Sequence, residues 1–197
     1  MADVSFQWLN EEESKPAPGA LRQVQALINT IDRESGEDRL ADPADAAPWL
    51  VANHLLDPGA VLALDDLRTV VDVREALRAM TIRNTGGQDP SREALAPLRK
   101  VAAATTARTE FADDGTVRLR PDGTSVRDRL LNILLIVKDA QLDGSWEHLK
   151  ACANEDCQWA FYDRSRNHGG TWCVMSSCGN KLKNREFRAR KRSEVSG

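Results

Sequence analysis

All four cysteines of the sequence lie in one short stretch of its C-terminal part. Four residues separate Cys152 from Cys157, another four separate Cys173 from Cys178, and fifteen lie between the two pairs. Two close pairs are typical of two knuckles that deliver four thiolates to one tetrahedral ion, so we predict a zinc site. Two disulfides, free structural thiols or a redox pair are the alternatives. Residues 1–16 carry acids and no apolar core where a signal peptide would carry bases, so we expect a cytoplasmic protein with unpaired thiols.

A zinc ion held by four protein ligands has no open position for water or substrate. We therefore expect one structural ion whose binding folds the module around it. Aromatic side chains are concentrated between the two knuckles, at Trp159, Phe161, Tyr162 and Trp172. They are expected to pack around the metal, since a small unit needs large side chains to form a core; stacking on bases is the alternative. His168 is predicted to lie at the surface or to face a phosphate.

The densest basic run follows the last cysteine. Seven basic residues and one acidic residue lie between Lys181 and Arg192, without proline or glycine, which predicts a helix that leaves the metal site. Lys181, Arg185 and Arg188 share one face of such a helix. This face is predicted to contact phosphates or a DNA groove, and a solvated basic tail is the alternative.

The stretch Cys-x4-Cys, FYDRSRN and TWCVMSSCGNK, followed by the basic run, resembles the CGNR zinc-finger family of bacterial proteins. In that family the finger follows an N-terminal ABATE domain. The resemblance implies a stress-responsive transcription regulator whose finger binds double-stranded DNA. Lys181 stands where the family has arginine; it keeps the charge and loses the planar fork used for bidentate contacts. The positions expected to contact nucleic acid are Arg164, Arg166, His168, Asn180, Lys181, Lys183, Asn184, Arg185, Arg188, Arg190, Lys191 and Arg192.

The charge is divided unequally along the 197 residues. Residues 1–150 contain 18 basic and 25 acidic residues, whereas residues 151–197 contain 9 basic and 5 acidic residues. An acidic body with a basic end is expected of a regulator that contacts nucleic acid through one end only. A single short finger covers little DNA, so we expect a homodimer. No apolar run approaches the length of a membrane span, and we expect no membrane partner.

The predicted fold class is mainly α with one small β-hairpin. We expect a flexible lead over 1–16, an ABATE-like helical domain over 17–148 and the zinc finger over 149–197. The hairpin is predicted around Asp114-Gly115, where short alternating runs flank a turn. Pro97 either delays or kinks the fourth helix. The short join between body and finger favours a finger packed on the body. Helices are predicted from Pro18 on, from Asp42 on, over 62–84, over 89–108 and, as the central buried helix, from Ser125 on.

The body contains two polar side chains that could bind an effector. Leu27 to Asp32 resembles the opening pattern of the ABATE domain, and Asn29 lies within it. Arg74 lies on an apolar helix stripe, where its guanidinium needs an internal acid or a bound anion. If the body senses a small molecule instead of only dimerising, Asn29 and Arg74 are the expected positions. The body has no catalytic motif, so we predict that the protein is not an enzyme; a module that binds RNA or an acidic protein is the alternative function.

Overall fold

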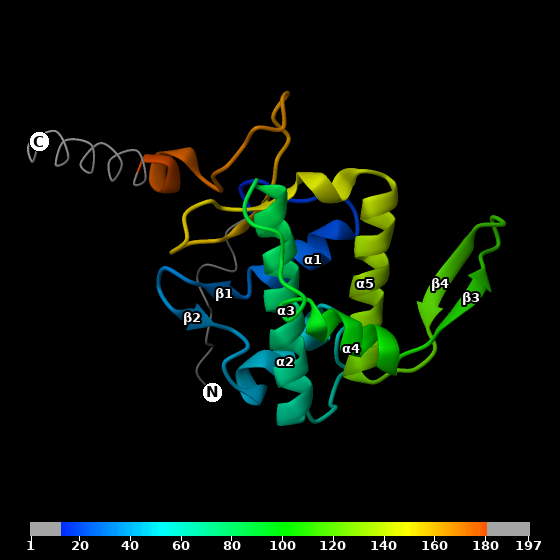
Figure 1. The fold of residues 1–197 in the computed structure, drawn as a ribbon. Helices are drawn as coiled ribbons and strands as arrows, with labels where there is room; N and C mark the ends of the chain where they lie inside the picture. Colours follow the sequence, from blue (N-terminus) through cyan, green and yellow to red (C-terminus); the bar gives the residue numbers. More distant parts are fainter. Residues whose placement is uncertain (1–12, 181–197) are drawn as a thin grey trace, which may run out of the picture.

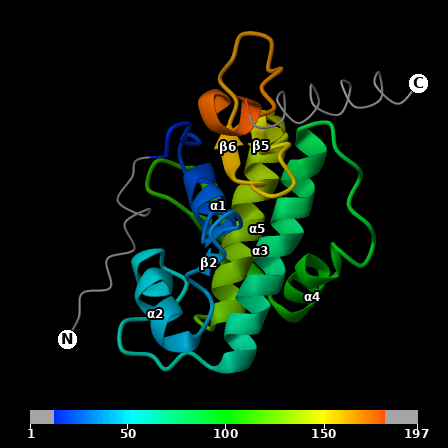
Figure 2. The ribbon, with the colours of Figure 1, turned by 90° about the vertical axis from the view of Figure 1, so that its left-hand side faces the viewer.

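The structure is a computed structural model, and it describes residues 13–180 of the chain. Three helices form the centre of the body: α1 (Leu21–Ile28), α3 (Leu64–Asn84) and α5 (Val126–Leu142). Each of the three contacts the other two, while α2 (Pro43–Ala52) packs on α3 and α4 (Ala96–Ala104) packs on α3 and α5 (Figures 1 and 2). No helix in the described range is long and apolar enough to cross a membrane.

The core of the body lies between α1, α3 and α5. Its fully buried members include Val24 and Leu27 of α1, Leu77 of α3, and Leu130 and Ile133 of α5. Burying each such side chain contributes about 1.5–3 kcal/mol relative to leaving it in water. This apolar contact fixes the body against which the C-terminal part of the chain packs.

The helix starts follow local signals in the sequence. Asp42 accepts hydrogen bonds from the first turn of α2, and Ser125 forms a capping box with Asp128 at the start of α5. Both starts confirm the predictions. Helix α4 begins at Ala96, so Pro97 occupies the first turn, where its missing N–H costs no hydrogen bond. The start at Ala96 confirms the delayed beginning that Pro97 predicted, whereas the predicted end at Arg108 is wrong because residues from Ala107 onward form a strand.

The described residues contain three antiparallel hairpins, where the sequence predicted one. The predicted hairpin joins β3 (Ala107–Phe111) to β4 (Val117–Pro121). The other two join β1 (Ile31–Asp32) to β2 (Glu37–Asp38), and β5 (Leu149–Ala151) to β6 (Ala160–Tyr162). Strands of two or three residues are too short to show alternation, which is why the sequence did not indicate them. The fold class, mainly α with small β, is confirmed.

The described part of the N-terminal lead lies against the C-terminal part of the chain. The Glu13 carboxylate accepts hydrogen bonds from Asn29 (2.7 Å) and from the Trp159 indole (3.1 Å). The Lys15 carbonyl accepts the Tyr162 N–H at 2.9 Å. The lead was predicted to be flexible, yet residues 13–16 are held by these partners, while residues 1–12 lie outside the described residues.

Candidate metal centre and nucleic-acid interface

The four cysteine sulfurs form one cluster. All four Sγ atoms lie within 4.8 Å of one another, and the distances from Cys173 Sγ to Cys157 Sγ and Cys178 Sγ are both 3.7 Å. Thiolates around a tetrahedral zinc ion lie about 3.8 Å apart, given a Zn–S bond of about 2.3 Å. All four cysteines are unpaired, which excludes the disulfide alternative in this structure. The donor set and its spacing thus fit one zinc ion held by Cys152, Cys157, Cys173 and Cys178.

Two turns deliver the four sulfurs. In the first knuckle, Cys152 follows β5 and Cys157 precedes β6, and the Asn154 carbonyl accepts the N–H groups of Cys157 and Gln158, both at 2.9 Å. In the second, Cys178 lies in η3 (Met175–Gly179), a single π-helical turn. A Cβ at Gly179 would lie 2.5 Å from the Met175 sulfur, so a side chain at this position would displace the Met175 side chain.

The thiols of the cluster do not ionise alike. Hydrogen bonds from the thiols of Cys157 and Cys173 lower the pKa of Cys152, so one sulfur ionises readily. The pKa of Cys157 is raised by its hydrogen bonds with Cys152 and Cys173 and by burial. Four thiols at this spacing therefore do not all ionise unless a positive ion neutralises them. Metal binding would displace the remaining protons and couple zinc affinity to pH.

The aromatic residues between the knuckles pack inward, as predicted. Phe161 is 1% exposed and forms a small core with the cysteines, and Trp159 and Trp172 pack against this core while half-buried. Tyr162 packs instead against the core of the body. The aromatic side chains thus supply the apolar surface that a metal-centred unit needs.

A loop over residues 163–170 presents three of the predicted nucleic-acid contacts. Arg164, Arg166 and His168 are all exposed there. Beneath them, the Lys150 ammonium pairs with the Asp163 carboxylate at 2.9 Å, with both side chains less than a tenth exposed. Asp163 also accepts the N–H groups of Ser165 (3.0 Å) and Gly170 (2.7 Å). The buried ion pair thus fixes the loop at both of its ends.

The contacts of this loop set the pKa of Asp163 and the position of His168. Burial by itself raises the pKa of Asp163, but hydrogen bonds from Lys150 and Ser165 hold it well below its usual range. His168 stacks on His148 with ring centroids 3.8 Å apart. His168 is exposed, which confirms the predicted surface position, and the possible metal-binding group found in the described residues consists of the four cysteines.

The basic helix predicted from Lys181 to Arg192 lies outside the described residues. Asn180 is exposed, donates to the Ser176 carbonyl at 3.1 Å, and has helical backbone angles. The chain therefore leaves the last cysteine in a helical conformation. The predicted contact residues beyond this point lie outside the described residues: Lys181, Lys183, Asn184, Arg185, Arg188, Arg190, Lys191 and Arg192.

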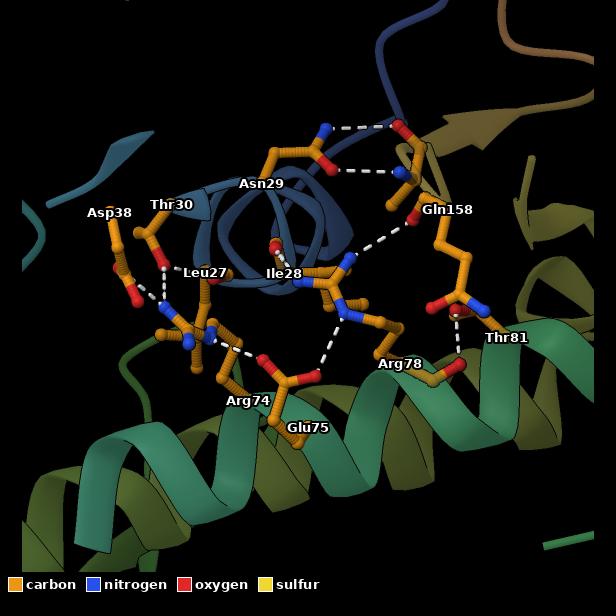
Figure 3. A network of polar contacts seen from close by, with 11 residues as sticks. Leu27, Ile28, Asn29, Thr30, Asp38, Arg74, Glu75, Arg78, Thr81 and Gln158 are labelled. Carbon is orange, nitrogen blue, oxygen red and sulfur yellow. Dashed lines mark hydrogen bonds and ion pairs between the residues drawn. The ribbon is translucent and has the colours of Figure 1, made fainter. Parts of the chain in front are cut away.

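The two candidate effector residues belong to one buried polar network (Figure 3). Arg74 pairs with Asp38 and Glu75, both at 2.7 Å, which confirms the internal-acid interpretation of its place on an apolar stripe. Asn29 bonds both backbone polar groups of Ala160. Their role in ligand binding stays a prediction.

Sequence reasoning missed the central member of this network, Arg78. Its guanidinium is 2% exposed and donates to Glu75 (3.0 Å), to the Ile28 carbonyl (2.7 Å) and to the Gln158 carbonyl (2.9 Å). The available signal was its spacing: Arg78 follows Arg74 by four residues and so lies on the same helix face.

Two family models match consecutive parts of the chain. The ABATE model, described as "Putative stress-induced transcription regulator", matches residues 21–142, and the CGNR zinc-finger model matches residues 148–191. A search of curated proteins gave no match. The two matches confirm that the chain resembles the ABATE domain in its N-terminal part and the CGNR zinc finger in its C-terminal part, in the expected order.

Proposed function

Because the chain belongs to the ABATE family and ends in a CGNR zinc finger, we propose that it is a cytoplasmic, non-enzymatic transcription regulator that binds duplex DNA through the finger. The observation that carries the proposal is the charge next to the metal centre. Seven basic residues lie between Lys181 and Arg192, directly after the last cysteine, in a chain whose net charge is −3. A cationic element on an acidic protein directs the phosphate backbone to one end of the molecule.

The proposed role of zinc is structural. Four protein sulfurs complete the coordination of the ion, so it offers no position to substrate. The buried Lys150–Asp163 pair holds the exposed loop that follows β6, and Cys178 lies in the turn η3. Two basic elements are therefore close to the ligands in the sequence: the loop with Arg164 and Arg166, and residues 181–192.

The packing of the aromatic side chains favours duplex DNA over single-stranded RNA as the partner. Proteins that bind single strands stack successive bases on exposed aromatic rings. Here Phe161 is buried, and Trp159 and Trp172 pack against the cysteine cluster. Two exposed arginines of the finger, Arg164 and Arg166, offer cations that suit contact with phosphates.

We further propose that two copies bind one DNA site. A single zinc-finger module buries only about 600–1,000 Å² of protein surface on DNA, which is small for selective binding. A homodimer doubles that area and predicts a site with two-fold symmetry. Sedimentation velocity with and without duplex DNA tests this step; a monomer that binds with one copy per site would contradict it.

The main test replaces two bases of the basic segment in the zinc-loaded protein. Arg185→Ala/Arg188→Ala should weaken duplex binding and lower the slope of log affinity against log salt by about two, since each phosphate contact contributes about one. The matched control is Arg118→Ala/Arg120→Ala in β4, which removes the same charge from the body. Zinc content, measured for every variant, should not change.

Parallel titrations with a matched RNA and with an acidic polymer separate the alternatives. Preference for the duplex, lost in the Arg185/Arg188 variant and kept in the control, supports the proposal. If the Arg185/Arg188 variant and the Arg118/Arg120 control bind the duplex with equal affinity, the basic segment is not part of the DNA interface. Equally weak binding to duplex DNA, RNA and the acidic polymer would show that the basic segment acts only as a charged tail.

A further inference from the structure

Side chains of the body complete the backbone hydrogen bonding of the first knuckle. The Asn29 amide accepts the Ala160 N–H at 2.7 Å and donates to the Ala160 carbonyl at 2.9 Å. Gln25 donates to the same carbonyl at 3.1 Å. These groups lie on the strand edge of β6, where another strand would supply such bonds in a larger sheet. Gln25 of α1 and Asn29, which caps the C-terminal end of α1, are both buried and take the place of that strand.

A second set of contacts reaches the backbone beside the two cysteines of this knuckle. Arg78 donates to the carbonyl of Gln158, the residue that follows Cys157 and has a left-handed φ of 49°. Thr85 donates to the carbonyl of Ala151, the residue before Cys152, at 2.6 Å. Helix α3 therefore contacts the chain on the outer side of each ligand, and the β5–β6 hairpin lies at one end of the helical body (Figure 2).

Arg78 also ties the knuckle to the rest of the body. The same guanidinium binds the Ile28 carbonyl at the end of α1 and the Glu75 carboxylate of α3 (Figure 3). Burial lowers the pKa of Arg78, which Glu75 opposes. An arginine that joins two helices and a metal knuckle transmits a displacement of any one of them to the others, since each of its bonds is directional.

The turn between β1 and β2 approaches the metal centre as well. A Glu34 carboxylate oxygen lies 3.3 Å from the Asn154 side-chain nitrogen and 4.0 Å from Cys178 Sγ. Asn154 is buried beneath the cluster, between the two ligands of the first knuckle. The body thus contacts the knuckle from α1, α3 and the β1–β2 turn.

We propose that the ABATE body is the support that organises the first knuckle for zinc, with Asn29 and Arg78 as its positioning residues. They act through the backbone next to Cys152 and Cys157, and they hold the two sulfurs in place before the ion binds. Coupling between two sites is reciprocal, so zinc at the cysteines stabilises the facing parts of α1 and α3 to the same degree. A conformational change in the body thereby changes the zinc affinity of the cysteines and the orientation of the finger.

The first experiment measures zinc release from the intact protein to a chromophoric chelator. Arg78→Met and Asn29→Ala should release zinc about 10- to 100-fold faster, the range typical for loss of groups that orient metal ligands, and Arg78→Lys should restore part of the difference. Arg68→Ala, an exposed arginine on the same helix, is the matched control. Val70→Ala removes apolar contact from α3 without touching the knuckle and should release zinc at close to the wild-type rate.

A second measurement uses the wild-type protein, so it tests the proposal even if a variant does not fold. Hydrogen exchange is followed before and after zinc is removed with a chelator. Faster exchange at residues 21–30 and 74–85, in addition to the finger, supports the proposal. Exchange that changes only within residues 149–180, or equal zinc release from Arg78→Met and Arg68→Ala, overturns it. Neither readout involves DNA, so this proposal stands or fails separately from the proposed function.

Discussion

The hairpins β3–β4 and β5–β6 have the same antiparallel pairing and opposite surroundings. The five-residue strands of β3–β4 project from the body into solvent, with Phe111 75% and Val117 55% exposed (Figure 1). The three-residue strands of β5–β6 are buried, with Leu149 and Ala160 fully enclosed. The longer hairpin was visible in the sequence, and the shorter one, which carries the metal centre, was not.

The difference shows where each hairpin obtains its stability. The β3–β4 pair relies on its own ladder, on cross-strand charges such as Glu110 with Arg120, and on a turn in which Gly115 has a φ of 79°. The β5–β6 pair is too short for that. It is held by the cysteine cluster on one side and by polar side chains of α1 and α3 on the other. Removing these supports should affect β5–β6 and leave β3–β4 unchanged.

Loss of one metal ligand should have the largest effect. Cys178→Ser removes a thiolate and with it much of the zinc-binding free energy, which is on the order of 10 kcal/mol in zinc-finger peptides. We expect loss of zinc, of ordered β5–β6 and of DNA binding, with the helices of the body retained. Metal analysis and near-ultraviolet circular dichroism measure this. Ser177→Ala, the preceding residue, is the control and should keep its zinc.

Breaking the buried ion pair beside β5–β6 should have the next largest effect. Asp163→Asn leaves the Lys150 ammonium buried without its charged partner, at a cost of about 3–5 kcal/mol in unfolding free energy. Thermal unfolding measures this cost. Asp139→Asn, which breaks an exposed pair with Lys138, serves as the control and should change the unfolding free energy by less than about 1 kcal/mol.

The stability difference between wild type and Asp163→Asn should also depend on pH. The folded-state pKa of Asp163 is lowered, so the stabilisation by its ionised form is fully present above the unfolded-state pKa of about 4 and is lost as the pH falls through the folded-state value. The stability difference between wild type and Asp163→Asn should therefore be constant near neutral pH and shrink in acid. Both proteins release zinc in acid, so their difference isolates Asp163. A difference that grows on acidification would contradict the assignment.

A change in the exposed hairpin should have the smallest effect. Phe111→Ser alters a side chain with no cover and should shift the unfolding free energy by no more than about 0.5 kcal/mol, with zinc content unchanged. Chemical denaturation, with sedimentation run alongside, measures this. A loss above about 2 kcal/mol would show that β3–β4 is covered in solution, and the comparison between the two hairpins would then no longer hold.

The sequence by itself determined the features that depend on local spacing and residue chemistry. The four cysteines define the metal centre because thiolate is a specific ligand and two close pairs form two turns. Asp42 and Ser125 predict helix starts because a cap bonds backbone groups only a few residues away. The β3–β4 turn follows from Asp114-Gly115 for the same reason.

Only the tertiary structure decided how the body holds the finger. Arg78 and Gln158 are 80 residues apart in the chain, and Asn29 and Ala160 are 131 apart. In both contacts one partner is a backbone group, the Gln158 carbonyl or the Ala160 N–H, and almost every residue has such groups, so the partner carries no mark in the sequence. Such contacts are set by the packing of α1 and α3, which brings a particular carbonyl within reach of a particular side chain.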